Sequence, residues 1–408
     1  MNIVMANKYY YMKGGAERYM FDLTDLLVRH GHAVIPFAMK DGRNNATHWS
    51  DKFVSPVQTE RVTFGWQGLR TAGRMLYSFE AQRKFASLLD EVRPNLVHLH
   101  NIYHQISPSI LPEAKSRGIP VVMTAHDYAL IAPNYALFHD GQICEHTRPN
   151  HFFNAVKHRC VKGSHAASAL AAFEMHFHRW LGLWRNNVDR IIAPSAFMAA
   201  MLEEYGIDGT KIAHVPYYID ANQWHPHYGG DYALYVGRLS GEKGVETLVR
   251  AAAIAKDVPV RIVGTGPEDM RLHRIAEKLG ADNVTFVGWK SGEELRQEYA
   301  KARFLVVTSP WYEVFGLIVF EAYASGKPVI STHMGGLGEI VRDGETGLLT
   351  AAGDVDDLAE RLEMLWNSPD RCVVMGRRAR HWIESDFTPE IHYRRLMDVY
   401  EAAGADVK

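Results

Sequence analysis

The chain has 408 residues, more than one hydrophobic core usually supports, so its length predicts two domains. A composition of 47% hydrophobic and 23% charged residues is typical of a globular protein and excludes a largely disordered chain. The formal net charge of -2 argues against a dedicated nucleic-acid binder, and we expect no nucleic-acid partner.

The first half of the chain alternates between short β-rich runs and helical patterns, which is typical of parallel sheets connected by helices. We therefore assign the fold class as α/β. The expected strands span residues 2–6, 33–37, 96–100, 121–124, 190–193 and 212–215. The expected helices between them include residues 16–30, 76–92 and 197–205.

A stretch containing Pro and Gly at 224–230 interrupts this pattern, and strand and helix signals restart at Tyr232. The strands expected after it span residues 232–236, 258–263, 283–287, 303–307 and 328–331. The expected helices span residues 245–256, 268–279, 292–301, 315–325 and 389–403. We predict a Rossmann-like domain at 1–226, completed by a C-terminal helix at about 388–408, and a second at 227–387.

The first residues and the cysteines predict the cellular compartment of the protein. The apolar run at 1–6 is too short for a signal peptide and is expected to form a buried strand. No run approaches the roughly 18 apolar residues of a membrane span. Three cysteines, an odd number, predict reduced thiols. We expect a cytoplasmic protein, with peripheral contact at the inner face of a membrane left open.

Glycines and cations cluster where strands of the second half end. Gly237, Arg238 and Lys243 follow a strand and precede a helix, near whose N-terminus both cations can bind a diphosphate. A solvated turn with ordinary surface charges is the alternative. Gly264 and Gly266 follow another strand and let a ligand approach the backbone. Because a third glycine and a strand-terminal acid are missing, an NAD site is disfavoured.

Two glutamates stand eight positions apart in an apolar segment, where an exposed salt-bridge role for both is disfavoured. Glu313 is expected in the loop before a helix and Glu321 about two turns into it. Since carboxylates repel phosphate, each is expected to bind hydroxyl groups. Backbone N–H groups of Phe315, Gly316 and Leu317 would receive the phosphate at the helix start. A buried helix with one structural glutamate is the alternative.

Three features of the first half are further candidates. Gly14 and Gly15 precede the first helix and can offer backbone N–H groups to an anion, although a flexible loop is the alternative. Tyr9–Tyr11 can serve as platforms for a sugar or lipid acceptor, or as packing residues. A lone histidine is more often structural than catalytic, but His126 follows a strand at the ligand-binding end of the sheet, and this position strengthens the case for a functional role.

Two patterns raise the question of a metal. His98 and His100 share one face of a strand, but no third ligand stands at a fitting spacing. Cys144, His146 and Cys160 provide thiolate and imidazole ligands, and would need a fourth from a neighbouring histidine. Reduced cysteines are the favoured interpretation. We predict no metal and leave open whether Cys144, His146 and Cys160 bind one.

In combination these motifs resemble the retaining glycosyltransferases of family 4, which have the GT-B fold. The resemblance is carried, in chain order, by Gly14-Gly15, His126, Gly237-Arg238 with Lys243, Gly264-x-Gly266 and Glu313-x7-Glu321. It covers almost the whole chain. It implies two Rossmann-like domains facing each other across a deep cleft, the N-terminal one binding the acceptor and the C-terminal one the nucleotide sugar.

The resemblance also implies roles for single residues. Arg238 and Lys243 would bind the donor diphosphate and stabilise the leaving nucleotide. Glu313 would orient the donor sugar and Glu321 would bind the ribose hydroxyls. His126 would contact the sugar near the reacting carbon.

The remaining donor contacts implied by the resemblance come from the backbone. Residues Gly15 and Phe315–Leu317 would assist with the diphosphate, and Trp289 and Lys290 would hold the base. Members of the family need no metal or other cofactor, because cationic side chains and a helix end replace it.

The implied reaction moves a hexosyl-type sugar from a nucleotide diphosphate sugar, UDP being favoured over GDP, to a hydroxyl acceptor. The tyrosine-rich first loop and the basic segment 139–165 favour a lipid-linked glycan or a polysaccharide precursor as acceptor, and a small molecule stays open. A sugar-nucleotide 2-epimerase and a non-catalytic nucleotide-sugar-binding protein are the alternatives. The Glu313 and Glu321 spacing favours transfer.

Overall fold

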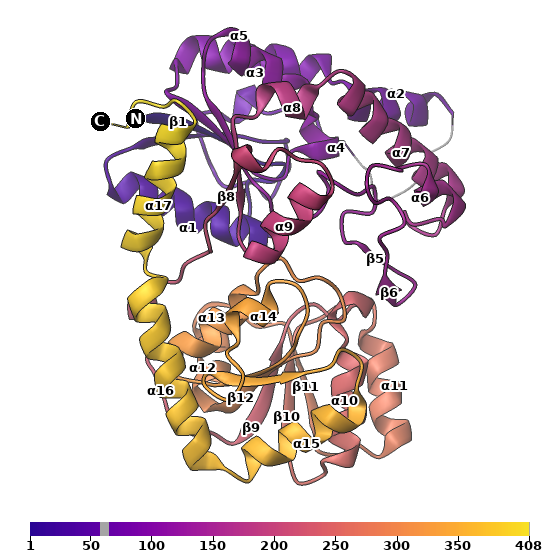
Figure 1. Ribbon diagram of the computed structural model, residues 1–408, viewed down its shortest axis with the longest axis vertical. Coiled ribbons are helices and arrows are strands. Elements are labelled where there is room, and N and C mark those ends of the chain that lie inside the picture. Colours follow the sequence, from indigo (N-terminus) through magenta and orange to yellow (C-terminus); the bar gives the residue numbers. More distant parts are fainter. Residues whose placement is uncertain (58–64, 408) are drawn as a thin grey trace. The chain divides into compact units, whose positions relative to one another are not determined.

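A computed structural model describes residues 1–57 and 65–407, and the chain folds into two compact units (Figure 1). Unit 1 comprises Met1–Leu137, Cys144–Val215 and Tyr393–Lys408, and unit 2 comprises Phe138–Ile143 and Pro216–His392. The sequence predicts domain boundaries at 226/227 and at about 388, whereas the two units meet along the chain at Val215/Pro216 and at His392/Tyr393. Within the described residues every helix is too short or too polar to cross a bilayer.

Unit 1 is built on a six-stranded parallel sheet with strand order β2-β1-β3-β4-β7-β8. Its strands are β1 (Asn2–Ala6), β2 (Ala33–Phe37), β3 (Leu96–Leu99), β4 (Val121–Thr124), β7 (Arg190–Ala193) and β8 (Ile212–His214). Every residue of β3 and β4 is buried, as expected where helices cover both faces of a parallel sheet. All six strands lie where the alternating pattern predicted them, to within one residue.

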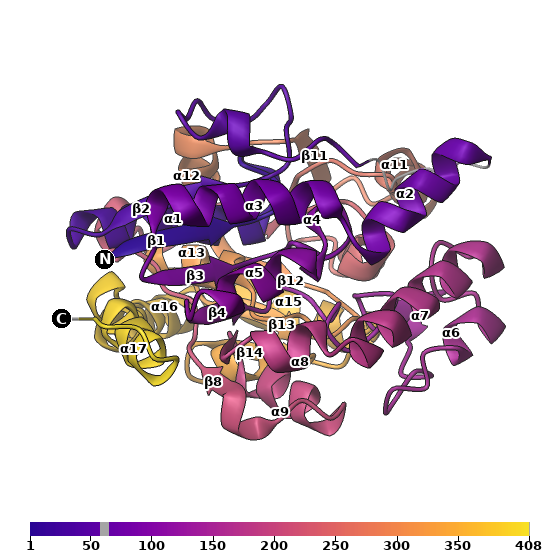
Figure 2. The ribbon, with the colours of Figure 1, turned by 90° about the horizontal axis from the view of Figure 1, so that it is seen from above.

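Helices connect and cover this sheet. The described helices are α1 (Gly15–Arg29), α2 (Trp66–Leu76), α3 (Phe79–Val92), α4 (Tyr103–Ile106), α5 (Leu111–Ser116), α6 (Asn154–Lys157), α7 (His165–Trp180), α8 (Leu183–Asn187) and α9 (Ala196–Glu204). α2 and α7 lie side by side at one end of the unit, and α6 packs on α7 (Figures 1 and 2).

The single helix predicted at 76–92 is wrong in its first turn. Leu76 ends α2, and α3 begins only at Phe79, because the Ser78 hydroxyl caps it by accepting a hydrogen bond from the Ala81 N–H at 3.2 Å. Phe79, one of the apolar residues whose spacing predicts this helix, is 76% exposed. The apolar spacing that predicted the helix therefore joined the end of one helix to the start of another.

Unit 2 contains a second six-stranded parallel sheet, with order β11-β10-β9-β12-β13-β14. Its strands are β9 (Tyr232–Val236), β10 (Val260–Val263), β11 (Val284–Gly288), β12 (Ala302–Val307), β13 (Val329–Thr332) and β14 (Gly347–Thr350), and a small hairpin pairs β5 (Phe138–His139) with β6 (Gln142–Ile143). Two Rossmann-like units confirm the predicted α/β class.

Two helical layers cover this second sheet (Figure 1). One layer contains α10 (Val245–Ile254), α11 (Asp269–Leu279) and α15 (Val355–Trp366), and the other contains α12 (Gly292–Lys301), α13 (Leu317–Ala324), α14 (Leu337–Ile340) and α16 (Pro369–Asp386). The core between sheet and first layer includes Leu248, Leu272 and Leu362, each at most 1% exposed. Helical periodicity therefore buries one stripe of each helix.

The last helix, α17 (Pro389–Ala402), follows a break at Phe387-Thr388, where Pro389 cannot continue the preceding hydrogen-bond ladder. Its residues from Tyr393 onward belong to unit 1. The Tyr393 hydroxyl is 2.7 Å from Nε2 of His32, and the Tyr400 hydroxyl is 2.7 Å from Nδ1 of His98. The C-terminal segment thus forms part of the core of unit 1.

Candidate functional site

The loop between β9 and α10 carries the two cations singled out in the sequence. Arg238 is exposed, and no carboxylate of the described chain lies within ion-pair distance of it. Lys243 ends a short 3-10 turn at Gly241–Lys243, and its ammonium contacts the Glu313 carboxylate (Nζ to Oε1, 2.5 Å). The same ammonium lies 5.0 Å from the centre of the Trp311 ring. One cation is therefore open to solvent and the other is paired.

Glu313 lies in the loop after β12, as predicted, and its side chain is 12% exposed. Its Oε1 also accepts a hydrogen bond from the Ser309 hydroxyl at 2.7 Å. Burial favours the protonated carboxyl, but attraction to the Lys243 ammonium and the hydrogen bond from Ser309 outweigh it, so the pKa of Glu313 lies below its ordinary value. The carboxylate is ionised at neutral pH.

A glycine pair after β13 holds the Glu313 backbone in place. The Gly336 N–H donates to the Glu313 carbonyl at 2.7 Å. Gly335 has φ of 59°, and a Cβ there would come within 2.4 Å of the same carbonyl oxygen. A side chain at 335 would therefore displace Glu313. Gly335 and Gly336 were not predicted from the sequence, although two glycines shortly after a strand are a signal for close backbone approach.

Glu321 lies on α13 and is 6% exposed, with the Tyr299 hydroxyl donating to its Oε2 at 2.8 Å. The helix begins at Leu317, two residues later than predicted. Gly316 caps it with φ of 107°, where a Cβ would lie 2.8 Å from the Leu337 side chain. Phe315 is buried just before it. The two glutamates therefore occupy a loop and a helix, in the order predicted.

Gly264 and Gly266 allow close approach of a neighbouring loop. Gly264 has φ of 140°, and a Cβ there would lie 1.8 Å from the Gly237 carbonyl oxygen. A Cβ at Gly266 would lie 2.2 Å from the carbonyl oxygen of Leu239. The close approach that the sequence attributed to a ligand is thus already made by the β9–α10 loop. These glycines position the loop that holds Arg238.

Trp289 and Lys290 directly follow β11. Trp289 is 68% exposed, an unusual position for a large apolar ring. The Lys290 ammonium lies 3.6 Å from a carboxylate oxygen of Glu294, four residues later on α12. An exposed indole beside a strand end provides a flat face that a planar base can stack on.

In unit 1, Gly14 and Gly15 mark the start of α1. Gly14 is its N-cap in an extended conformation, and the Arg18 N–H donates to the Gly14 carbonyl at 3.0 Å. Glu17 in the first turn is buried, and the Asn7 amide donates to its carboxylate at 3.3 Å. The loop is therefore anchored to the sheet.

The tyrosines of the first loop pack within unit 1. The Tyr10 ring lies 5.4 Å from Phe21 and meets Phe53 edge-on at 5.9 Å. Tyr11 is 7% exposed and its ring centre is 5.2 Å from that of Tyr9. These contacts are those expected of packing residues, the alternative to an acceptor platform.

His126 is hydrogen-bonded to His100, with 2.7 Å between Nε2 of His126 and Nδ1 of His100. Nε2 of His100 lies 2.8 Å from the Met5 sulfur, which has no proton and can only accept. A neutral His100 ring therefore has its single proton on Nε2, where it can donate to the sulfur, and its Nδ1 accepts. The hydrogen bond between the two histidines is then donated by Nε2 of His126. Burial, followed by the nearby Lys8 ammonium, lowers the pKa of His126 to about 3. His126 is neutral, with its proton on Nε2.

The metal interpretations lose support from the geometry. His98 uses Nδ1 for the Tyr400 hydroxyl and Nε2 for the Thr124 hydroxyl, at 2.7 and 2.8 Å. The Cys144 and Cys160 sulfurs are 3.4 Å apart, within hydrogen-bonding distance of one another. Nowhere in residues 1–57 and 65–407 are three His, Cys, Asp or Glu side chains grouped to hold a metal.

The predicted site residues are divided between the two units. Gly14, Gly15 and His126 belong to unit 1, and the rest belong to unit 2. Within unit 2, Lys243 contacts Glu313 directly, and the Gly264 backbone lies against that of Gly237.

Two family profiles match the sequence in consecutive parts. The profile described as "Glycosyltransferase Family 4" matches residues 13–223. The profile described as "Glycosyl transferases group 1" matches residues 221–382. Together they include every residue of the candidate site.

Named relatives are similar over part of their length. A D-inositol 3-phosphate glycosyltransferase of Nocardia farcinica is 37% identical over 220 residues, covering 47% of this chain and 48% of the relative. A glycogen synthase of Mycobacterium tuberculosis is 30% identical over 297 residues, covering 70% of this chain and 69% of that protein. The chain thus spans about half of the first relative and about two thirds of the second.

Solved structures of similar fold cover nearly the whole chain. Sucrose-phosphate synthase of Thermosynechococcus elongatus has a TM-score of 0.71 at 22% identity, covering 98% of both chains. Anabaena HepE, solved in complex with UDP and glucose, has a TM-score of 0.68 at 17% identity, covering 98% of this chain and 100% of the other. These similarities concern the fold.

Proposed function

The chain belongs to glycosyltransferase family 4, with the GT-B fold, and we propose that it transfers a hexosyl group from a nucleotide diphosphate sugar to a hydroxyl acceptor with retained configuration. The observation that carries the proposal is the group formed by exposed Arg238, Lys243 and Glu313 at the carboxyl ends of β9 and β12. Ligands of open parallel sheets bind at such strand ends.

The donor diphosphate is assigned to the cations of this group. The Arg238 guanidinium is exposed and can make paired hydrogen bonds to phosphate oxygens. Lys243 supplies a second positive charge once the diphosphate competes with Glu313 for its ammonium. The N–H groups of Phe315–Leu317 at the start of α13, and of Gly14 and Gly15, assist. Stabilising the leaving diphosphate then supplies much of the catalysis.

The hydroxyl groups of the donor are assigned to the acidic side chains. Glu313 is ionised, so it accepts hydrogen bonds from the sugar, and Glu321 accepts from the ribose alongside the Tyr299 hydroxyl. Neutral His126 contacts the sugar near the reacting carbon. The exposed face of Trp289, with the backbone at Lys290, holds the base.

In the proposed transfer step, the departing phosphate acts as the base. The acceptor hydroxyl attacks the anomeric carbon on the face that the leaving group vacates, and its proton passes to the departing diphosphate oxygen. The proposal needs no metal, because Arg238 and Lys243 neutralise the developing charge. UDP is the first nucleotide to test, and a lipid-linked glycan or a polysaccharide precursor is the proposed acceptor, probed alongside small-molecule alcohols.

The test combines binding and turnover. In a thermal-shift panel of UDP-, GDP- and ADP-sugars, a bound donor at 100 times its dissociation constant adds about 2.7 kcal/mol of stability. Donor hydrolysis followed by proton NMR shows the configuration of the first sugar released. If none of these nucleotide sugars raises the melting temperature of the protein, the proposal is wrong.

Two variants locate the chemistry. Arg238→Ala and Lys243→Ala are expected to lower kcat by on the order of a hundredfold and to leave acceptor affinity unchanged. Lys278→Ala, at an exposed lysine near the end of α11, is the matched control. Donor binding without turnover in the wild-type protein would favour the non-catalytic alternative, and isomerised donor without any acceptor would favour an epimerase.

A further inference from the structure

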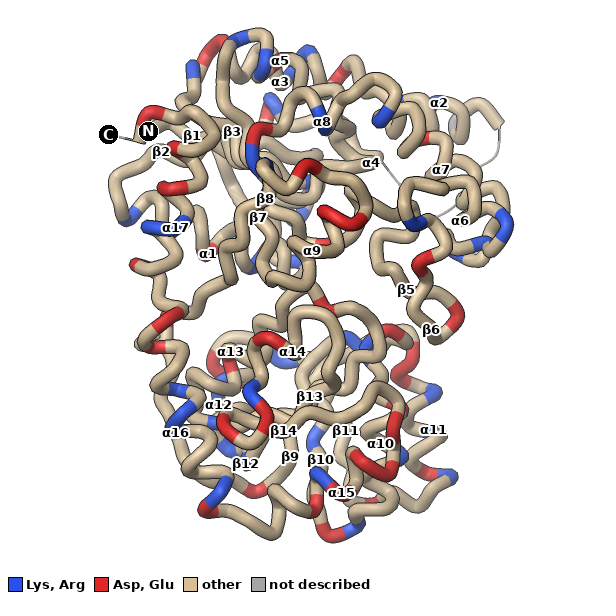
Figure 3. Tube along the Cα trace, viewed as in Figure 1, with Lys and Arg blue, Asp and Glu red and all other residues tan. Residues whose placement is uncertain are grey.

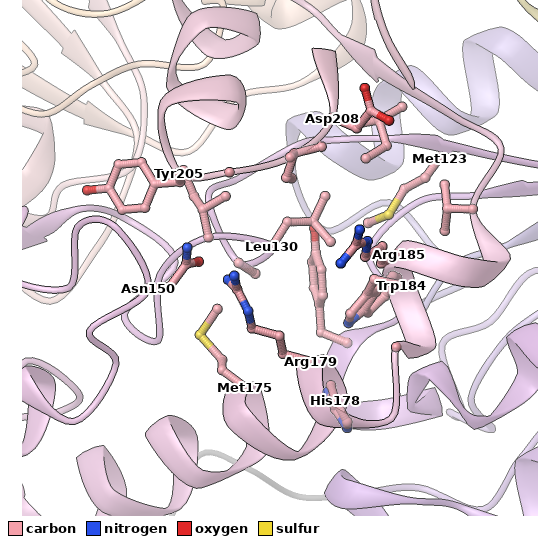
Figure 4. Close-up of a pocket in the computed structure, with 18 of the residues that line it drawn as sticks. Met123, Leu130, Asn150, Met175, His178, Arg179, Trp184, Arg185, Tyr205 and Asp208 are labelled. Atoms are coloured by element: carbon pink, nitrogen blue, oxygen red, sulfur yellow. The ribbon is translucent and has the colours of Figure 1, made fainter. Parts of the chain in front are cut away.

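Unit 1 contains a cavity that the donor residues do not use. Its volume is about 680 Å³, and it lies between α7, α8, the segment after β4 and the loop after α9 (Figure 4). Its lining combines polar groups with apolar side chains, among them Met123, Leu130, Ile131, Met175 and Trp184. A cavity of this size and lining suits a ligand with an aliphatic part.

Two arginines add positive charge to this cavity. Arg179 on α7 and Arg185 on α8 extend into it from two sides (Figure 4). Neither guanidinium forms an ion pair or a hydrogen bond with another side chain of the described chain. Guanidinium groups without a carboxylate partner favour a phosphate, which they bind with paired hydrogen bonds.

The other charged groups of the cavity are already engaged. Glu174 is buried against His104, with 2.8 Å between Nδ1 and the carboxylate. Lys211 donates to the backbone carbonyls of Arg185 and Val188, each at 2.7 Å. Asp208, the remaining carboxylate of the lining, accepts from the Thr210 hydroxyl and is also attracted by the Arg185 guanidinium, which lies beyond ion-pair distance. The cavity therefore keeps a net positive charge.

The surface beside this cavity is apolar and basic. Trp180 on α7 is 80% exposed, and on the adjacent α2 Trp66 and Leu69 are 83% and 68% exposed. From residue 146 to 188 the sequence has one acidic residue, the buried Glu174, and lysines and arginines follow the loops next to α6 (Figure 3). Exposed tryptophan with an excess of cations is typical of a surface that meets an anionic bilayer.

We infer that this cavity binds a membrane lipid with a phosphate headgroup, the phosphate lying between Arg179 and Arg185 and the first part of the aliphatic chain lying against Leu130 and Met175. Free phosphate would leave the apolar walls empty, and a neutral lipid would leave the arginines without a partner. The exposed side chains Trp66, Leu69 and Trp180, on the neighbouring helices α2 and α7, are the groups proposed to meet the bilayer. None of these residues is assigned to the donor site.

Isothermal titration of the full chain with dihexanoyl phosphatidic acid, used as a monomer, tests the cavity. We expect one site per chain, with affinity reduced tenfold to a hundredfold in Arg179→Gln and in Arg185→Gln. Arg83→Gln, at an exposed arginine of α3 outside the cavity, is the matched control and should bind as the wild type does. Inorganic phosphate and dihexanoylglycerol should each bind at least tenfold more weakly.

A further variant distinguishes lipid binding in the cavity from binding at the surface. Leu130→Trp fills the cavity without changing any charge, so it should abolish binding of the short-chain lipid. Equal affinity in the wild type and in both arginine variants would overturn the inference, as would equally tight binding of inorganic phosphate. Binding to vesicles of phosphatidylcholine and phosphatidic acid that survives in all three variants would assign the interaction to the surface alone. No donor is present, so a failure of the proposed transfer leaves this test intact.

Discussion

The Lys243 ammonium and the Glu313 carboxylate lie 2.5 Å apart and join the loops that follow β9 and β12. The pair holds two groups of opposite charge at one strand end. A donor diphosphate and a donor hydroxyl can therefore be recognised by residues that position each other before binding.

Replacing Glu313 with glutamine tests this pair. The amide keeps the shape of the side chain but removes the charge, so Lys243 loses its ionic partner and the proposed contact with the sugar loses its charged acceptor. We expect kcat to fall by on the order of a hundredfold, with a smaller change in donor affinity. Steady-state kinetics with varied donor measures both. Wild-type kcat in Glu313→Gln would remove Glu313 from the mechanism.

The Glu313 pKa also predicts how stability depends on pH. Because the folded-state pKa is lowered, the ionised carboxylate stabilises the fold above the unfolded-state pKa, and this contribution is lost as pH falls through the folded value. The melting temperatures of wild type and Glu313→Gln should therefore differ most near neutral pH and converge in acid. A difference that stays constant from pH 7 to 3 would contradict the assignment.

His100 should act on turnover through His126. His100→Leu removes the acceptor for the His126 Nε2 proton, whereas the amide oxygen of His100→Asn stands near the position of Nδ1 and keeps it. We expect kcat to fall roughly tenfold to a hundredfold in the leucine variant and to recover largely in the asparagine variant. Thermal melts of both variants separate this effect from loss of folding. Equal kcat in both variants would show that His100 only fills space.

Protonation of His126 should destabilise unit 1 in acid. Its folded-state pKa of about 3 lies below the ordinary value of 6.5, so the fold favours the neutral ring. This contribution is complete above about pH 6.5 and is lost as pH falls toward 3. His126→Gln should therefore lose less melting temperature than the wild type over that range, as followed by circular dichroism. Parallel curves would contradict the neutral assignment.

Gly264 is expected to be intolerant of a side chain. A Cβ would overlap the Gly237 carbonyl, so Gly264→Ala should cost about 3 kcal/mol and lower the melting temperature by roughly 6 to 10 °C. Gly280→Ala is the control, because φ there is also positive, at 61°, but no atom lies within 4 Å of the new Cβ. That variant should cost about 1 kcal/mol. Equal losses in the two variants would exclude the steric argument.

Strand positions and the order of the site residues could be predicted from the sequence because both depend on local patterns. Buried parallel strands appear as short apolar runs, and the glycines and charges after them mark their ends. Glu313 in a loop and Glu321 in the next helix followed from Ser325-Gly326 and Pro328, which end that helix.

Contacts between distant segments could not be read in the same way. The pairing of Lys243 with Glu313 spans 70 residues, and the donation from Gly336 to Glu313 depends on the path of a loop after the next strand. The cavity in unit 1 was missed because α7 and α8 have no distinctive motif, and their arginines become neighbours only through packing. Gly264 was assigned to a ligand because sequence does not show which backbone comes close.

The contact between His98 and Tyr400 sets an order of events during synthesis. The two residues are 302 positions apart, so this hydrogen bond to the buried histidine of β3 can form only after the chain has been made as far as Tyr400. Unit 1, although translated first, can close its core only after unit 2 has been made. A chain stopped before Tyr393 would therefore carry an unfinished first unit.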